Sequence, residues 1–447
     1  MLLSPWQHVG IPERRHKRSS KQGENCGGKT STGGTILVLL GLIFLRLLNA
    51  LMIRTTFVPD EVWQSVEVAH RWVYGFGALT WEWAPTVAIR SPLYPLFFAG
   101  IYKALAFSGV DSRDAIVLLP RLFHGLLTGV TDYTIYLMAI RLSGKSSAKW
   151  VLLAEMTSWF TAYCAPRSLS NSLEWALHAM AFRYYPWPPN LGLSPTSTTT
   201  VPFLFHVCLC ILLRPTAAVL WVPVCLHYFL RIWKEYSFND FRRTLCLALM
   251  IGLSYAAVSL GVDRLVFGRW TRWLIALLAA ANIAVAGYTC LVHQRGPDAL
   301  MSKLAKQAIA ANWADMSPRP SILVLMPCHS TPYLSYLHVN VSLRLLSCDP
   351  DLSAWHNTDP RAYIDEADAF YKDPTRWLNS NYPNGDTLPQ YIAMFTELTQ
   401  NEDYGQAVMH WLLAGNYSIC TEIFHSHIVS HPRHSRRITR RRSKFDL

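Results

Sequence analysis

Residues 36–53, ILVLLGLIFLRLLNALMI, decide the fold class of this 447-residue chain. Arg46 and Asn49 are the strongly polar side chains in this otherwise apolar run. A helix of about 20 mostly apolar residues crosses the hydrocarbon core of a bilayer, so the run predicts a first membrane span. The 35 residues before it are polar and basic and have no apolar core of their own, which is unlike a cleaved signal peptide.

Further apolar runs predict that the chain crosses the membrane several times. They cover residues 92–110, 115–140, 148–165, 201–230, 245–262 and 274–292. The chain is 51% hydrophobic and only 16% charged, whereas about a quarter of the residues of a soluble protein are charged. We therefore predict an α-helical polytopic membrane protein whose transmembrane helix bundle spans residues 36–295. Ionisable residues inside these runs, such as Arg121, His124 and Asp132, are expected to face the bundle interior, because an ion in lipid is costly.

Basic residues set the expected orientation of the chain. The net charge is +12, and basic clusters lie in the N-terminal tail, residues 1–35, and in the C-terminal tail from Arg436 to Lys444. Basic residues flank membrane spans on the cytosolic side, so we place the N-terminal tail in the cytosol and the following loop, residues 54–90, in the lumen. Topogenic and membrane-surface charge explains both clusters beside apolar spans, and we expect no nucleic-acid partner.

The composition changes near residue 296, where the apolar runs shorten. We predict a soluble, lumenal appendage of α/β type over residues 296–447, in which residues 322–326 form a buried strand. Two N-glycosylation sequons, at Asn340 and Asn416, agree with a lumenal location. The ten cysteines show neither the spacing of a metal site nor a disulfide framework, so we interpret them as small buried side chains and expect no bound metal.

The first lumenal loop contains the best candidates for catalysis, the adjacent carboxylates of Asp60 and Glu61. A carboxylate at a membrane interface can act as a general base towards a sugar hydroxyl. If a helix begins near Asp60, the side chains of Gln64, Glu67 and His70 share its face or lie close by. The alternative is structural, because acidic residues commonly cap the first turn of a helix.

Aromatic and basic residues near the span ends are candidates for binding a substrate. Trp81 and Glu82 belong to a Trp-Glu-Trp segment whose indoles either stack on a sugar or anchor the chain at the interface. Arg90 either forks onto a phosphate or snorkels to the interface. Arg214, in the middle of the run 201–230, is the most costly placement of a charge, and its competing role is to hold helices together.

These residues form blocks that resemble a known family. The blocks are Pro59-Asp60-Glu61-x-Trp63-Gln64-x-x-Glu67-x-x-His70, Leu79-Thr80-Trp81-Glu82-Trp83, Ile89-Arg90-Ser91, Arg167-x-Leu169-Ser170-Asn171-Ser172-x-Glu174, Leu213-Arg214-Pro215-Thr216, and Asp263-Arg264 with Trp270. They are similar to the dolichol-phosphate-mannose-dependent mannosyltransferases of glycosyltransferase family 22. The resemblance implies the GT-C membrane fold, a multi-pass location in the endoplasmic reticulum membrane, and Asp60 as the catalytic carboxylate, with Glu61 either orienting the acceptor or sharing charge.

Three later segments narrow the resemblance to the branch of the family that acts on the GPI anchor. They are Leu291-Val292-His293-Gln294-Arg295-Gly296, Leu325-Met326-Pro327-Cys328-His329-Ser330-Thr331-Pro332-Tyr333, and Asp365-Glu366-Ala367-Asp368-x-Phe370-Tyr371. The implied reaction adds the third mannose of the anchor in α-1,2 linkage. The implied partners are the donor dolichol-phosphate mannose and a GPI-precursor glycolipid, and Arg90 and Arg214 are then candidates for the phosphate of the donor. The resemblance does not define a metal or another cofactor.

The chain departs from the family pattern at one place. After Trp270 it passes almost directly into the span that precedes Leu291, and a block of further spans found in the family is missing. Two hypotheses follow: an active mannosyltransferase, or a catalytically inactive, truncated member of the same family. A transporter is a third hypothesis, but the sequence lacks the repeated halves often seen in transporters.

Overall fold

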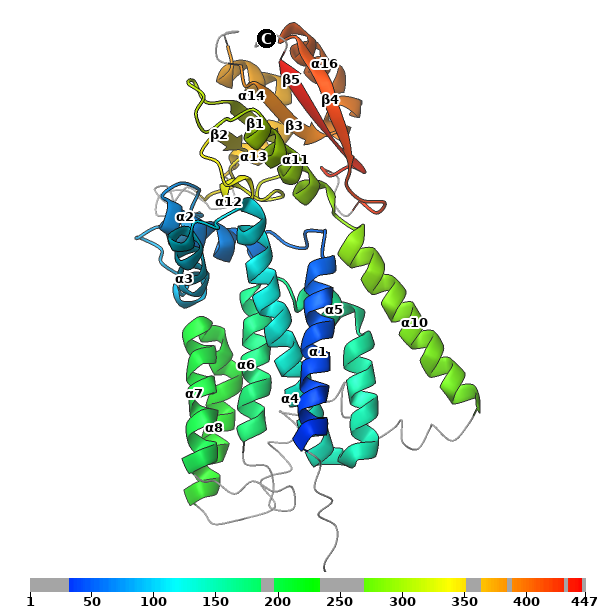
Figure 1. The fold of residues 1–447 in the computed structure, drawn as a ribbon. Helices are drawn as coiled ribbons and strands as arrows, with labels where there is room; N and C mark the ends of the chain where they lie inside the picture. The colour runs from blue at the N-terminus through cyan, green and yellow to red at the C-terminus, as the bar shows by residue number, and fades with distance from the viewer. Residues whose placement is uncertain are drawn as a thin grey trace, which may run out of the picture.

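The computed structural model describes residues 32–185, 197–233, 269–350, 363–383, 388–429 and 433–443. The N-terminal tail up to residue 31, the predicted span 245–262 and the Asp263-Arg264 block lie outside the described residues. Figure 1 shows a group of helices with a sheet-containing domain at one end, and the loop after the first helix lies where the two meet.

Two helical segments of the described chain are long and apolar enough to cross a membrane. One is Gly34–Met52 in α1 (Thr32–Met52), and the other is Arg272–Ala310, which combines α10 (Arg269–Leu291) with α11 (Gly296–Ala310). Three shorter apolar helices are α3 (Leu93–Ser108), α7 (Ser197–Leu213) and α8 (Ala218–Trp233). A mostly helical membrane region is therefore present, with fewer full-length spans in the described residues than the sequence predicts.

The predicted spans 115–140 and 148–165 fall within α4 (Arg113–Thr157) and the short α5 (Trp159–Cys164). The backbone of Gly144 is not helical, with φ 83° and ψ 170°, so α4 consists of two limbs. A positive φ of this kind is accessible to glycine without steric cost. The chain reverses there, and the second limb returns towards α5 (Figure 1).

The run 201–230 was predicted as one span, and this prediction is wrong. It forms the two helices α7 and α8, joined by the 3-10 turn η4 (Pro215–Ala217). Pro215 disfavours a helical conformation at the residue before it, and Arg214 is indeed extended, with φ −143° and ψ 109°. Arg214 therefore lies at a helix junction rather than in the middle of a span. The two helices pack with α6 (Ser170–Tyr184) around the buried Trp221.

Ionisable residues of the helices face the interior, as predicted. Arg46 of α1 donates from Nε to Asp132 Oδ2 of α4 at 2.6 Å, and both side chains are almost completely buried. Arg121 and His124 of α4 are buried as well. Pairing removes the cost of an isolated ion in an apolar environment.

The C-terminal domain is built on a five-stranded mixed sheet, with strand order β2-β1-β3-β5-β4. The strands are β1 (Ser321–Leu325), β2 (Ser342–Leu345), β3 (Tyr391–Phe395), β4 (Tyr417–Phe424) and β5 (Arg437–Ser443). The helices α11 and α12 (Leu334–Leu337) contribute to the hydrophobic core on one face, and α13 (Glu366–Lys372), α14 (Pro374–Asn381) and α16 (Gly405–Ala414) to the core on the other. The short α15 (Glu397–Gln400) follows β3. The predicted strand 322–326 corresponds to β1.

Two sequence-based interpretations are wrong in this domain. The basic C-terminal tail is not membrane-surface charge over residues 437–443, because it forms β5, which lies between β3 and β4. Arg441 is buried there, and Arg440 donates to Gln307 Oε1 of α11 at 2.6 Å. Cys328 and Cys348 form a disulfide, although the cysteine spacing did not predict one.

Candidate functional site

The loop between α1 and the next helical segment, residues 53–61, is anchored by its backbone to the end of α10. The amide of Arg54 donates to the carbonyl of Cys290 at 2.9 Å, and the amide of Thr56 donates to the carbonyl of Gln294 at 3.2 Å. Pro59 and Asp60 then begin a helical segment that continues as η1 (Val62–Val66) and α2 (Glu67–Tyr74). We call residues 53–61 the α1–η1 loop.

Asp60 and Glu61 are neighbours in sequence but lie in opposite environments. Asp60 is exposed to solvent, whereas Glu61 is 2% exposed. Glu61 Oε2 accepts from Arg167 Nη1 at 2.8 Å, and Glu61 Oε1 accepts from the amide of Phe57 at 3.3 Å. Glu61 therefore stabilises the conformation of the loop, and Asp60 is the carboxylate that is accessible to a substrate.

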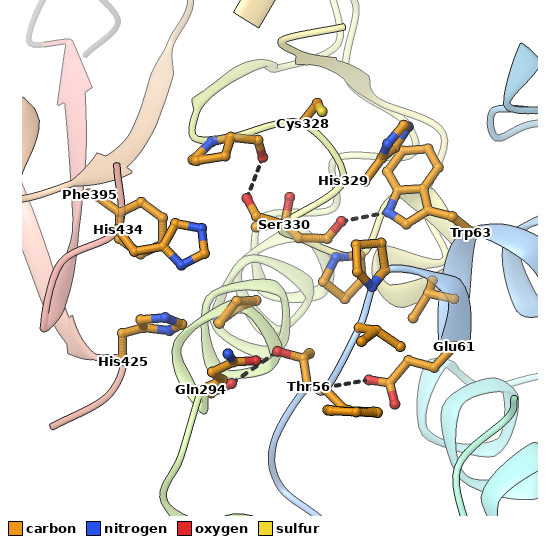
Figure 2. A pocket seen from close by; sticks show the side chains of 18 residues that line it. Thr56, Glu61, Trp63, Gln294, Cys328, His329, Ser330, Phe395, His425 and His434 are labelled. Atoms are coloured by element: carbon orange, nitrogen blue, oxygen red, sulfur yellow. Dashed lines mark hydrogen bonds between the residues drawn. The ribbon is translucent and has the colours of Figure 1, made fainter. Parts of the chain in front are cut away.

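A cavity of about 170 Å³ lies between the α1–η1 loop and the C-terminal domain. Its walls are the α1–η1 loop with Trp63, the segment 327–332 that follows β1, the junction of α10 and α11, and two histidines near the end of the sheet, His425 and His434. Figure 2 shows these histidines on the opposite side of the cavity from Trp63 and Glu61. The loop and the domain thus line one cavity, and the described residues that line it include Glu61 but not Asp60.

Trp63 connects the α1–η1 loop side of the cavity to the C-terminal domain. Its indole Nε1 donates to the carbonyl of Thr331 at 3.0 Å, and its ring meets His329 edge-on at a centroid distance of 4.6 Å. Burial lowers the pKa of His329, and the carboxylates of Asp349, Glu82 and Asp60 oppose this shift.

Glu67 and His70 do not share the exposed face of Asp60, so the prediction of a common face is wrong. Both are completely buried, and Gln64 is half-buried. The segment Val62–Val66 is a π-helix, which has more residues per turn than an α-helix and so changes the register. Glu67 Oε2 accepts from the amide of Ser335 at 3.0 Å, and His70 Nε2 lies 3.0 Å from His338 Nδ1. These two residues hold the C-terminal domain against α2.

The predicted substrate-binding residues beyond the loop fall into two ion pairs. Arg90 donates to Glu82 Oε1 at 2.6 Å, beside the half-buried Trp81 of η2 (Trp81–Trp83). Arg214 donates to Glu174 Oε2 of α6 at 2.9 Å. Each of the two arginines suggested for a phosphate therefore already has a carboxylate partner.

Four residues at or near the site were not predicted from the sequence: Arg167, His329, His425 and His434. Arg167 and His329 lie in two segments that resemble the family, 167–174 and 325–333, so the sequence did contain an indication of their role. His425 and His434 come from opposite ends of the connection between β4 and β5. Only the pairing of these strands brings them to the cavity.

Comparison with known proteins supplies the family. The model of the Alg9-like mannosyltransferase family matches residues 37–278 and 271–338. GPI alpha-1,2-mannosyltransferase 3 of Xenopus laevis is 31% identical over 522 aligned positions, which cover 94% of this chain and 93% of that protein. The human protein of the same name is 30% identical, covering 89% and 85%. The solved structure of ArnT from Cupriavidus metallidurans bound to undecaprenyl phosphate has a TM-score of 0.47 and 11% identity, covering 92% of this chain and 98% of that chain.

The chain belongs to the Alg9-like mannosyltransferase family and is a glycosyltransferase. The chain is also shorter than the aligned part of its Xenopus laevis relative. Ninety-four per cent of 447 residues is about 420, so about 100 of the 522 aligned positions have no counterpart in this chain. The family match consists of two segments, 37–278 and 271–338, which overlap directly after Trp270. This junction coincides with the position at which the sequence indicates a missing block.

Proposed function

We propose that this protein transfers mannose from dolichol-phosphate mannose to the GPI-anchor precursor and adds the third mannose in α-1,2 linkage. The observation that carries the proposal is the match to relatives named GPI alpha-1,2-mannosyltransferase 3 over nearly the whole chain. The alternative hypothesis of an inactive truncated member is not favoured by matches of this extent.

Asp60 acts as the general base in the proposed mechanism. Its exposed carboxylate takes the proton from the acceptor 2-hydroxyl as that oxygen attacks the anomeric carbon of the donor. The bond between the anomeric carbon and the phosphate oxygen breaks, dolichyl phosphate leaves, and the configuration is inverted. Glu61 is buried and does not face the solvent. It holds the α1–η1 loop in place through its ion pair with Arg167.

The proposed setting is the endoplasmic reticulum membrane, with a GT-C arrangement of helices and the cavity on the lumenal side. Asn340 and Asn416, the two sequon asparagines of the C-terminal domain, are both exposed, which supports this side. The Cys328–Cys348 disulfide beside the cavity also suits an oxidising compartment. No metal or cofactor is part of the proposal.

Complementation tests the proposal. Cells lacking the third GPI mannosyltransferase receive the parent chain, Asp60→Ala, or Asp114→Ala, and the surface level of a GPI-anchored protein is measured. Asp114 is the matched control, since its carboxylate is 85% exposed at the start of α4. We expect rescue by the parent and by Asp114→Ala, and none by Asp60→Ala. Absence of rescue by an expressed parent chain would refute the proposed function.

A further inference from the structure

Most arginines near the cavity end of the helices already have carboxylate partners among the described residues. Arg167 pairs with Glu61, Arg90 with Glu82, and Arg214 with Glu174, at 2.6 to 2.9 Å, and Arg121 lies 3.9 Å from Asp298. A guanidinium that is neutralised by a carboxylate is a poor receptor for a phosphate. Arginines without a carboxylate partner are therefore the better candidates for binding a phosphate.

Arg54 and Arg295 differ from these residues. Both are exposed, and neither side chain forms an ion pair or a hydrogen bond with any other residue that the structure describes. The backbone brings them to the same region, since the amide of Arg54 donates to the carbonyl of Cys290 on the last turn of α10, and the amide of Thr56 donates to the carbonyl of Gln294, the residue before Arg295. The amide of Arg295 in turn donates to the carbonyl of His425 at 3.0 Å.

Their position fits the headgroup of a lipid. Arg54 follows the apolar helix α1 directly, and Arg295 lies between the apolar helix α10 and α11. The neighbouring residues Thr56 and Gln294 line the cavity. A chain extends by at most about 3.3–3.6 Å per residue, so the Cα atoms of Arg54 and Asp60 are no more than about 22 Å apart. An arginine at this boundary is thus at the end of an apolar helix and within that reach of the proposed base.

Snorkelling is the plainer explanation of an arginine at the end of a membrane helix. In the proposed topology, however, this end is lumenal, where short loops carry fewer basic residues than on the cytosolic side. Two unpaired guanidinium groups beside a cavity therefore need a reason beyond topology. Arginine is well suited to a phosphate because its fork of N–H donors matches the phosphate oxygens.

We propose that Arg54 and Arg295 together bind the phosphate of a long-chain isoprenyl phosphate at the membrane edge of the cavity. The inference rests on the proposed function, in which the donor is such a lipid. It replaces the sequence-based suggestion of Arg90 and Arg214 for this role. In the reaction the two guanidinium groups would stabilise the second negative charge that the phosphate gains when its bond to the sugar breaks.

Binding to the purified full-length chain in detergent tests the proposal without requiring turnover. The probes are dolichyl phosphate, dolichol, inorganic phosphate and phosphatidylinositol, measured by native mass spectrometry with the parent, Arg54→Gln, Arg295→Gln and the double variant. We expect about tenfold weaker binding of dolichyl phosphate for each lost guanidinium, the usual effect of a charge-assisted hydrogen bond. Binding of dolichol should be weak and unchanged, and the lysine variants should retain part of the affinity.

Arg272→Gln is the matched control, because Arg272 is an exposed arginine near the opposite end of α10. Its variant should bind dolichyl phosphate as the parent does. The proposal is overturned if the double variant, folded by size-exclusion and thermal-melting criteria, binds dolichyl phosphate like the parent. It is also overturned if phosphatidylinositol binds equally well with the same dependence on both arginines, which would indicate a general anionic-lipid surface, or if inorganic phosphate alone accounts for the effect.

A transfer assay on the same samples separates this proposal from the proposed function. Transfer by the parent together with arginine-independent lipid binding would leave the function intact and refute the phosphate site. Arginine-dependent binding of dolichyl phosphate without any transfer of mannose would support the site and count against the function.

Discussion

At the scale of single residues, Arg167 organises the floor of the site. Its guanidinium is fully buried and donates to the carbonyls of Tyr163 and Thr55, each at 2.7 Å, and to Glu61 Oε2 at 2.8 Å. It also lies over the ring of Tyr163, 4.4 Å from the centroid. A buried charge with this many partners is stable only while all of them are present. Arg167 therefore fixes the α1–η1 loop, and with it the position of Asp60.

Replacing Arg167 by Gln is expected to destabilise the protein strongly. The change leaves the buried carboxylate of Glu61 without its cation, and breaking a buried pair in this way costs about 3–5 kcal/mol. The control is Arg437→Gln, which breaks the exposed pair between Arg437 and Glu422 and should cost at most about 1 kcal/mol. Thermal unfolding in detergent measures both. Equal melting temperatures for the two variants would contradict the structural role of Arg167.

The sequence predicted that adjacent carboxylates lie in the loop after α1, but not the different environments of the two residues. Adjacent carboxylates after an apolar span are visible in the sequence, but Asp60 and Glu61 differ only because one of them meets Arg167, 106 residues away. The π-helical turn from Val62 to Val66 likewise changed the faces on which Glu67 and His70 lie. Contacts between residues distant in the chain, and a rare local geometry, carry this information, and a single sequence does not reveal either.

At the scale of elements, the close packing of α1 against α4 holds the helical region together. Gly129 of α4 faces the backbone of α1, and a Cβ added there would lie 2.6 Å from Ile43 Cα. A Cβ at Gly125 would lie 3.0 Å from the carbonyl oxygen of Arg46. Small residues at helix interfaces permit such close approach within membranes. The approach in turn allows Arg46 to reach Asp132.

Gly129→Ala is therefore expected to separate the two helices. The added methyl group meets backbone atoms, which cannot move aside as a flexible side chain does, and overpacking of this kind typically costs about 1–3 kcal/mol. Gly41→Ala is the matched control within α1, since a Cβ at Gly41 meets nothing within 4 Å. The control should be neutral or slightly stabilising, because alanine favours a helix more than glycine. Thermal melting that ranks the two variants in the opposite order would refute this view of the interface.

Among the elements, hydrophobic runs predicted the positions of helices well and their number poorly. The run 201–230 was predicted as one helix because Arg214 and Pro215 hardly lower its average hydrophobicity. Pro215 nevertheless ends the helix, and the run forms α7 and α8. The strand β5 was missed because its arginines resemble a disordered basic tail, whereas pairing with β3 and β4 gives them partners. Strand pairing between distant segments is the part of the fold that local patterns do not contain.

At the scale of the whole molecule, the chain is shorter than the aligned part of its relatives, and its family match consists of two segments. About 100 aligned positions lack a counterpart, and the family match is interrupted where α10 begins. In the span Arg272–Ala310, only 6% of the most apolar window is buried. The exposed helix α10 therefore lies next to the point at which the family pattern is broken, which links the departure seen in sequence to a feature of the structure.

The C-terminal domain also depends on long-range contacts with the helical region. Glu67 and His70 of α2 contact Ser335 and His338, each 268 residues further along the chain, and Arg113 of α4 donates to the carbonyl of Tyr336 at 3.0 Å. These contacts set the domain above the α1–η1 loop and so close the cavity. Because the interface contains buried ionisable groups, its stability is expected to depend on pH.

Burial raises the pKa of Glu67 from 4.5 to about 7, against the opposing effect of its hydrogen bonds from Ser335 and Ala78. Between these two values the folded protein holds a proton that the unfolded chain has released, so stability falls as the pH rises from about 4.5 to about 7 and changes little above that. The full shift corresponds to about 3.4 kcal/mol, of which about 2.5 kcal/mol falls between pH 5 and pH 8.5. Glu67→Gln mimics the protonated carboxyl and should remove the loss. Between pH 5 and pH 8.5 the stability of the variant, measured by thermal or denaturant unfolding, should therefore rise by about that much relative to the parent. Identical pH profiles would show that burial does not raise the pKa of Glu67.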